Sequence, residues 1–96
     1  MKPSQALKRH RAEIRRIIAS YRAGNARVFG SVLHGKDDGS SDLDLLVDPR
    51  EHMTLFDIEA IRYELRELLD VEVDVLTPNA LPDSFRDKVL GEAAPI

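Results

Sequence analysis

The segment that most constrains the fold is DLDLLV, residues 42–47, in which apolar residues alternate with aspartates. Alternate side chains of a β-strand point to opposite sides, so the odd-numbered positions form an apolar face and Asp42 and Asp44 lie on the other. We therefore predict a strand that is covered on one face and carries two carboxylates on the other, about 6 to 7 Å apart. The pair Asp48-Pro49 is expected to end it.

Upstream of this strand, the pattern predicts a helix followed by a short strand. Ser4 is a candidate N-cap, and apolar residues then recur at helical spacing until Gly24-Asn25, which is typical of a left-handed helix stop. The short apolar segment 26–29 is predicted to form the strand.

A turn and a loop connect the two predicted strands. Gly30-Ser31 ends the first strand, and Ser31 is a candidate cap for a brief helical turn that Gly35 ends. The polar segment 36–41, KDDGSS, is predicted to be a loop in which Asp37 and Asp38 are solvated.

Downstream, an apolar stripe over 54–70 predicts a second long helix, which we expect to cover the sheet. Residues 71–76, VEVDVL, alternate again and predict a third strand with Asp74 on the same face as Glu72. Pro82 is the candidate first residue of a short closing helix.

These elements predict an α/β (α+β) fold with a small mixed sheet of three to four strands and helices packed on one face. The chain has 96 residues with 43% hydrophobic content, which is consistent with a single domain over 1–96. It contains no cysteine and no apolar run near the roughly 20 residues needed to span a bilayer. We expect a soluble, cytoplasmic protein without a membrane partner.

Charge is distributed unevenly along the chain. Residues 1–27 contain eight Lys or Arg residues against one acidic residue, and residues 28–96 contain six against sixteen. This division is consistent with a phosphate-bearing ligand near one region and cations near the other, or with a solvated basic helix over an acidic body.

Asp42, Asp44 and Asp74 are the candidate metal ligands and catalytic residues. If the third strand pairs beside the second, the three carboxylates share a face and repel one another by roughly 2 kcal/mol per pair at an effective dielectric near 20. A bound cation would reverse this effect, and oxygen ligands favour Mg²⁺ or Mn²⁺ over zinc. Two such ions can assist an in-line phosphoryl displacement.

Gly30 and Ser31 are the candidate phosphate-binding residues. A glycine permits close approach, and the start of a helical turn offers backbone N–H groups and a hydroxyl to an anion. Each element alone is a weak signal, since Gly-Ser is usually a turn and Asp-x-Asp is often a solvated strand edge. Their combination at fixed spacing, with Ser41 directly before the aspartate pair, is much more specific.

This combination resembles the signature of the polymerase-β-like nucleotidyltransferase superfamily: Gly30-Ser31, ten intervening residues, Asp42-Leu43-Asp44, and Asp74 in a later strand. In length and loop style the chain is similar to the minimal nucleotidyltransferases, the MNT family, which are often antitoxins of HEPN-type toxins. The resemblance extends over most of the chain from residue 26 to 76, and the tail also resembles the closing helix of that family.

The resemblance implies a nucleoside triphosphate, most simply ATP, held by Gly30 and Ser31 with Ser41 nearby. It implies two Mg²⁺ ions on Asp42 and Asp44, and Asp74 on the ion that activates the acceptor hydroxyl. The expected reaction is transfer of AMP to a hydroxyl of a cognate HEPN toxin.

One position departs from the family, since Leu33-His34 stands before Gly35 where an arginine is common. His34 or Lys36 is a possible substitute toward the triphosphate, and Arg27 enters the first strand close enough to be considered for the same role.

Two other functions remain open. The first is an antitoxin that neutralises its partner by binding alone, with an inactive triad. The second is a nucleic-acid-binding module that uses the basic first helix; it is disfavoured because aromatic platforms and a recognisable binding motif are missing.

Overall fold

The computed structural model describes all residues from 1 to 96. In chain order the elements are α1 (Pro3–Ser20), β1 (Ala23–Phe29), α2 (Gly30–Leu33), β2 (Leu43–Pro49), α3 (Leu55–Leu69), β3 (Val73–Leu76), the 3-10 helix η1 (Pro78–Ala80), α4 (Asp83–Glu92) and β4 (Ala94–Pro95).

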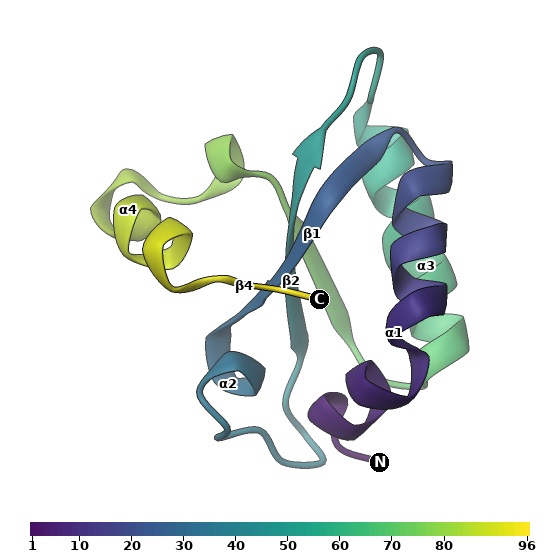
Figure 1. Ribbon diagram of the computed structural model, residues 1–96, viewed down its shortest axis with the longest axis vertical. Coiled ribbons are helices and arrows are strands. Elements are labelled where there is room, and N and C mark those ends of the chain that lie inside the picture. The colour runs from purple at the N-terminus through teal and green to yellow at the C-terminus, as the bar shows by residue number, and fades with distance from the viewer.

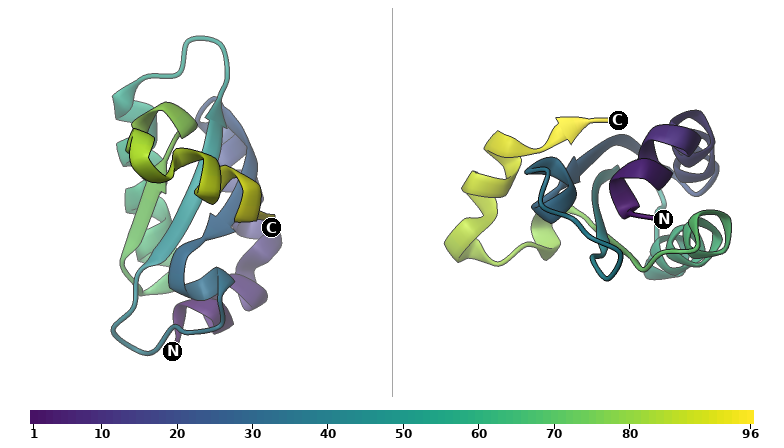
Figure 2. Two further views of the ribbon diagram at one scale, coloured as in Figure 1. Left: turned by 90° about the vertical axis from the view of Figure 1, so that its left-hand side faces the viewer. Right: turned by 90° about the horizontal axis from the view of Figure 1, so that it is seen from below.

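The four strands form one mixed sheet in the order β3-β2-β1-β4. β1 is antiparallel to both β2 and β4, and β3 is parallel to β2. The long helices α1 and α3 cover one face of this sheet, whereas α4 lies on the opposite side (Figures 1 and 2). The expected mixed sheet with a helical layer is therefore confirmed, and only the short closing helix lies on the carboxylate side.

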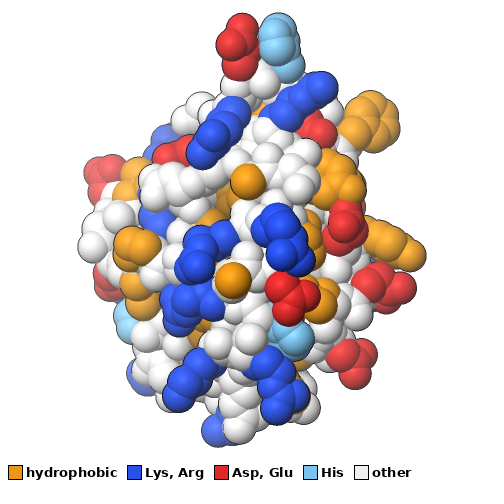
Figure 3. All heavy atoms as spheres, turned by 45° about the vertical axis from the view of Figure 1, so that its right-hand side comes forward, with side chains coloured by type: hydrophobic (Ala, Val, Ile, Leu, Met, Phe, Trp, Pro, Cys, Tyr) orange, Lys and Arg blue, Asp and Glu red, His pale blue; other side chains and the backbone are white.

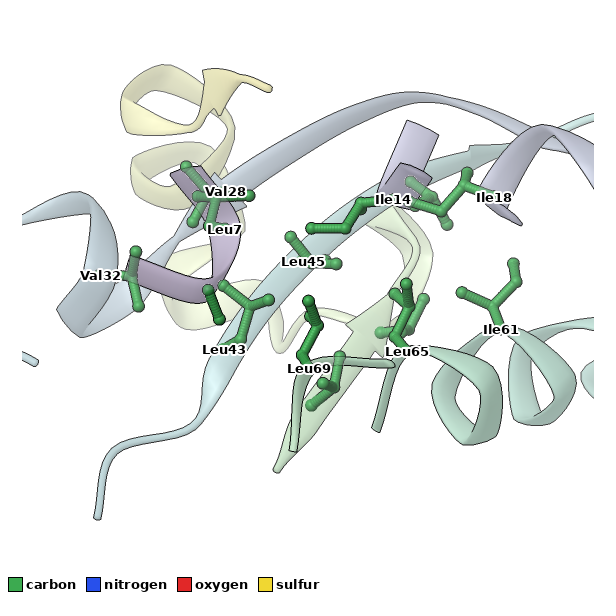
Figure 4. Packing of buried hydrophobic residues seen from close by; sticks show 14 of the residues in the cluster. Leu7, Ile14, Ile18, Val28, Val32, Leu43, Leu45, Ile61, Leu65 and Leu69 are labelled. Carbon is green, nitrogen blue, oxygen red and sulfur yellow. The ribbon is translucent and has the colours of Figure 1, made fainter. Parts of the chain in front are cut away.

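The core lies between the sheet and the layer of α1 and α3 (Figure 4). The odd-numbered apolar residues of β2 are completely buried there, as the alternation predicted. Leu46 points to the other side and is also fully buried, as is Leu81 after η1. β2 is thus enclosed on both faces at that level, although not at Asp44. None of the helices is both long and apolar enough to cross a membrane.

The predicted end of the first helix was wrong. α1 ends at Ser20, Arg22 takes the left-handed conformation with φ of 62°, and β1 begins at Ala23. Gly24-Asn25 lies inside β1, where the register with β2 shifts and Asn25 also has a positive φ. The left-handed signal in the sequence was real, but it forms an irregularity within a strand.

Other boundaries moved by one or two residues. β2 continues through Asp48 to Pro49, because Pro49 lies at its last position, opposite Ala23, where a missing N–H is tolerated. β3 begins at Val73, since Asp70 ends α3 in the left-handed conformation. Pro82 is the N-cap of α4 rather than its first residue. The two-residue strand β4 was not predicted.

Asp37 is buried, although its loop was expected to be solvated. Its Oδ2 accepts the backbone N–H of Ser4 at 2.8 Å, and Ser4 lies in the first turn of α1 instead of capping it. This hydrogen bond lowers the pKa of Asp37 below its usual value. The loop 36–41 is thereby fastened to the start of α1 by a residue 33 positions away.

We predict that Asp37→Ala lowers the free energy of unfolding at pH 7 by about 1 to 2 kcal/mol, because an N–H of the first helical turn loses its acceptor. A carboxylate with a lowered pKa stabilises the fold above its ordinary pKa, and this contribution is lost as the pH falls through the lowered value. The difference from the wild type in urea unfolding should therefore shrink below about pH 4. Lys36→Ala, at an exposed neighbour, is the control, and a difference that stays constant down to pH 3 would contradict the assignment.

Candidate active site

Asp44 and Asp74 are brought together by the parallel pairing of β2 and β3. The register places Leu43 opposite Val73 and Asp44 opposite Asp74. Both carboxylates lie on the face of the sheet away from α1 and α3, because their neighbours in each strand point into the core. Two aspartates 30 residues apart in the sequence are thus adjacent in space.

The electrostatics of this pair are unfavourable. Burial raises the pKa of Asp44 to about 6, and the negative charges of Asp74 and Asp42 act in the same direction. None of the three carboxylates forms an ion pair with Lys, Arg or His. The site is consequently a concentration of negative charge that the protein itself leaves uncompensated.

Gly30 lies directly against Asp44. β1 ends at Phe29, which is opposite Asp44 in the register, and Gly30 follows with φ of +72°. A Cβ at Gly30 would be 2.2 Å from Oδ2 of Asp44. The structure thus adds a second reason for a glycine at this position, because any side chain would displace the carboxylate. Ser31 follows in α2 and is partly buried.

Asp42 and Ser41 lie at the entrance to β2. Asp42 is exposed, one residue before the strand. The hydroxyl of Ser41 accepts the backbone N–H of Asp38 at 2.9 Å, so it helps to close the turn of the loop. Ser41 also lines a polar cleft of about 330 Å³ with Arg66 and Glu72. Its role toward a nucleotide remains a prediction.

The donor set fits a hard cation, although the ligands are not preassembled. Asp44 and Asp74 are neighbours in register, and Asp42 is two residues from Asp44 with its side chain exposed. No three His, Cys, Asp or Glu side chains are gathered closely enough to hold a metal ion. Oxygen-only ligands and unbalanced charge are the features that Mg²⁺ and Mn²⁺ require. Asp42, Asp44 and Asp74 are the residues that would hold such ions, once the exposed Asp42 side chain turns inward.

Two polar contacts on the carboxylate side of the sheet were not predicted from the sequence. Arg27 pairs with Asp48 and also donates to the backbone carbonyl of Asn25, so its guanidinium is engaged within the sheet. His34 Nε2 lies 3.2 Å from Oε2 of Glu92, which connects α2 to α4. These partners are 21 and 58 residues apart, and no local pattern could have indicated them.

The carboxylates lie on an open face. The four clefts of the surface are lined by other residues, and neither Asp44 nor Asp74 lines any of them. A small metabolite would therefore find few walls here, whereas a macromolecule can approach the sheet directly.

The sequence from residue 7 to 95 matches a family model described as a nucleotidyltransferase domain. The chain belongs to this nucleotidyltransferase family. It is 36% identical over 80 residues to a Methanocaldococcus jannaschii protein named "Putative protein adenylyltransferase MJ0435", covering 83% of this chain and 86% of that protein. A second protein of that organism, "Putative protein adenylyltransferase MJ0126", is 26% identical over 88 residues, covering 92% and 87%.

Solved structures agree with this assignment. One described as "Structure of putative minimal nucleotidyltransferase" has a TM-score of 0.86 and 38% identity, over 97% of this chain and 95% of that one. Another, described as "Crystal structure of the toxin-antitoxin with AMP-PNP", has a TM-score of 0.73 at 17% identity, over 88% and 69%. The nucleotidyltransferase thus shares its fold with a chain from a toxin–antitoxin structure.

We predict that Asp44→Asn makes the metal-free protein more stable at pH 7.5. A carboxyl whose pKa is raised to about 6 in the folded state favours folding at low pH, and this stability is lost as the pH rises from about 4 through 6. With allowance for solvent screening of a half-exposed group, the gain is about 1 to 2 kcal/mol. Thermal unfolding in EDTA between pH 4 and 8 measures it.

The effect of Mg²⁺ on the melting temperature tests whether Asp44 is a metal ligand. Millimolar Mg²⁺ with ATP should raise the melting temperature of the wild type by preferential binding to the folded state, and should leave Asp44→Asn nearly unchanged. An equal shift in both proteins would remove Asp44 from the metal site.

Gly30→Ala should destabilise the protein by about 2 kcal/mol or more, since a left-handed backbone and a close contact with Asp44 both oppose the new Cβ. The double variant Gly30→Ala/Asp44→Ala should recover the part due to the contact. Urea unfolding of the two single variants and the double variant gives the coupling, and strictly additive effects would disprove the contact.

Proposed function

We propose that this nucleotidyltransferase transfers AMP from ATP to a hydroxyl group of a protein. The observation that carries the proposal is the uncompensated pair of Asp44 and Asp74 on an open face of the sheet, beside Gly30. The names of the M. jannaschii relatives support transfer of an adenylyl group to protein. A cytoplasmic location belongs to the same proposal, because ATP is the donor.

In the proposed reaction the acceptor oxygen attacks the α-phosphorus of ATP. A new phosphorus–oxygen bond forms as the acceptor O–H bond breaks and its proton passes to water; the bond from the α-phosphorus to the oxygen bridging to the β-phosphorus breaks, and pyrophosphate leaves. Asp42, Asp44 and Asp74 would hold Mg²⁺ or Mn²⁺, which would lower the pKa of the acceptor hydroxyl and offset the charge of the phosphates. Asp74, exposed in β3, orients the acceptor hydroxyl toward the α-phosphorus and accepts its hydrogen bond.

The open face supports a macromolecular acceptor. With no enclosed pocket at Asp44 or Asp74, the hydroxyl must be positioned by a docked partner, and a tyrosine side chain is long enough to reach the sheet. The likeness to a chain from a toxin–antitoxin structure containing AMP-PNP supports a toxin as that partner. That the toxin is of the HEPN type is our proposal from the family resemblance. Adenylylation of the tyrosine would then neutralise the toxin.

An antitoxin that acts by binding alone is the second candidate. Two observations favour it: the three carboxylates are not gathered into a ready metal site, and His34 contacts Glu92 at the position where an arginine is common in the family. Nucleic-acid binding through α1 is less favoured as the main activity, because α1 lies on the face opposite the carboxylates.

We predict that Asp74→Asn keeps ATP binding within about threefold and loses at least about a hundredfold in transfer rate, because orientation of the acceptor is lost while the phosphate contacts remain. The protein is incubated with Mg²⁺, ATP and the product of the adjacent gene, as the candidate toxin partner, and the mass of that partner is measured. The expected result is an increase by one or more AMP groups.

Asp38→Asn, in the loop, is the matched control and should transfer AMP at the wild-type rate. If the wild type neutralises the partner without changing its mass, and Asp42→Asn and Asp74→Asn neutralise it equally well, the proposed catalysis is wrong and the binding-only antitoxin takes its place.

A further inference from the structure

The outer surface of α1 is strongly basic. Residues 1–22 contain seven Lys or Arg residues and a single acidic one, Glu13. Basic side chains gather over α1 on the face seen in Figure 3. In the continuous part of α1 after the bend at His10, Ala12 and Ala19 lie in the middle of the exposed surface, and Arg15 and Arg16 flank them. Lys8 and Arg9 are also exposed, and they precede the bend.

The outer surface of α3 is acidic and carries two protruding aromatic rings. Phe56 is 87% exposed and Tyr63 is 62% exposed, and both lie on the solvent side of the helix, near Glu59 and Glu67. Residues 55–72 contain six acidic residues against two arginines. Both arginines already contact carboxylates of this chain: Arg62 lies 3.4 Å from Glu59 and Arg66 lies 3.3 Å from Glu72.

These two surfaces lie side by side. α1 and α3 pack against each other in one layer and run in opposite directions (Figure 1). The layer therefore presents a positive stripe next to a negative stripe with aromatic side chains. A two-fold rotation about an axis parallel to the helices, between α1 and α3, places the positive stripe of each copy on the negative stripe of the other.

We propose that the α1–α3 face is a homodimer interface, occupied by a second copy of this chain. The proposal rests on charge complementarity between two identical faces, since one rotation places each positive stripe against the negative stripe of the other copy. An axis across the helices would instead place α1 against α1, and the basic residues would repel.

The positions of the residues along the axes of α1 and α3 indicate which side chains would meet in the dimer. Ile18 of α1 is level with Ile61 of α3, and Ile14 with Leu65 (Figure 4). A rotation about an axis parallel to the helices preserves these levels. The Arg15 and Arg16 pair of one copy therefore reaches the part of α3 around Tyr63 in the other.

The chemistry at this level is favourable. An arginine guanidinium stacks on an aromatic face and pairs with carboxylates, which Tyr63 with Glu59 and Glu67 can provide. The small side chains of Ala12 and Ala19, on either side of this level, leave room for the Tyr63 ring. Both copies contribute the same contacts, so every favourable pair occurs twice.

The area suits a weak dimer. α1 bends at His10, so its continuous part beside α3 runs over residues 11–20 and is about 15 Å long; α3 is about 22 Å long, and neighbouring helices lie about 10 Å apart. Such a layer covers about 370 Å² in projection, which is below the roughly 600 Å² per partner at the lower end of standard interfaces and is typical of a weak, concentration-dependent dimer. The carboxylate faces remain outside, so the dimer does not depend on the proposed transferase activity.

Sedimentation velocity of the full chain tests the interface. At about 100 μM and about 50 mM NaCl the expected species has twice the 10.8 kDa mass of the chain, and it should dissociate by about 0.5 M NaCl as the charges are screened. Arg15→Glu/Arg16→Glu should weaken dimerisation at least about tenfold, as should Glu59→Lys/Glu67→Lys. Lys88→Glu, on α4, is the control and should leave the dimer unchanged.

A charge swap provides the decisive comparison. Combining Arg15→Glu/Arg16→Glu with Glu59→Lys/Glu67→Lys in one chain reverses both stripes and should restore the dimer. Circular dichroism and thermal melting confirm that each variant is folded.

Three results would overturn the proposal: a wild type that is monomeric under these conditions, a dimer that survives the arginine reversal, or a combined variant that stays monomeric. A monomeric wild type that binds a single-stranded RNA through Arg15 and Arg16 would assign the basic stripe to a polyanion instead.

Discussion

The site depends on β2 being hydrogen-bonded on both edges. Its antiparallel pairing with β1 brings Gly30 against Asp44, and its parallel pairing with β3 brings Asp74 beside the same residue. Because side chains alternate along a strand, the residues that anchor β2 in the core also fix the direction of Asp44. A slip of one residue in either pairing would send the carboxylate into the apolar core.

Two aspartates on one face of β2 show how the protein distributes charge. Asp48 forms an ion pair with Arg27 and also accepts a hydrogen bond from the side-chain amide of Asn25, so its charge is balanced within the sheet. Asp44, four residues earlier, has only other carboxylates near it, and its pKa is raised to about 6. Asp48 is thus compensated within the sheet and Asp44 is not, and a carboxylate with a perturbed pKa and no compensating charge is typical of functional sites.

The two faces of the sheet differ in the elements that cover them. One face is covered by α1 and α3, whose buried sides form the core and whose outer sides carry opposite charge. The other face is only partly covered, by α4 and the segment around η1, and is open at the carboxylates. A partner protein can therefore reach Asp44 and Asp74 while the helical layer contacts something else. The proposed chemistry and the proposed association would therefore lie on opposite faces of the sheet.

Alternation and helical spacing in the sequence correctly predicted three of the four strands, the two long helices and the face that carries Asp44, because these depend on local geometry and on burial of apolar side chains. The sequence did not reveal that Asp37 fastens its loop to α1, that Gly24-Asn25 lies inside a strand, or that Arg27 is engaged by Asp48. Each of these depends on a partner far away in the chain. By itself the sequence determined which residue types share a face, since that follows from the backbone period. Only the tertiary structure decided which charges are balanced and which remain free, because compensation depends on distances between strands and helices that no local pattern encodes.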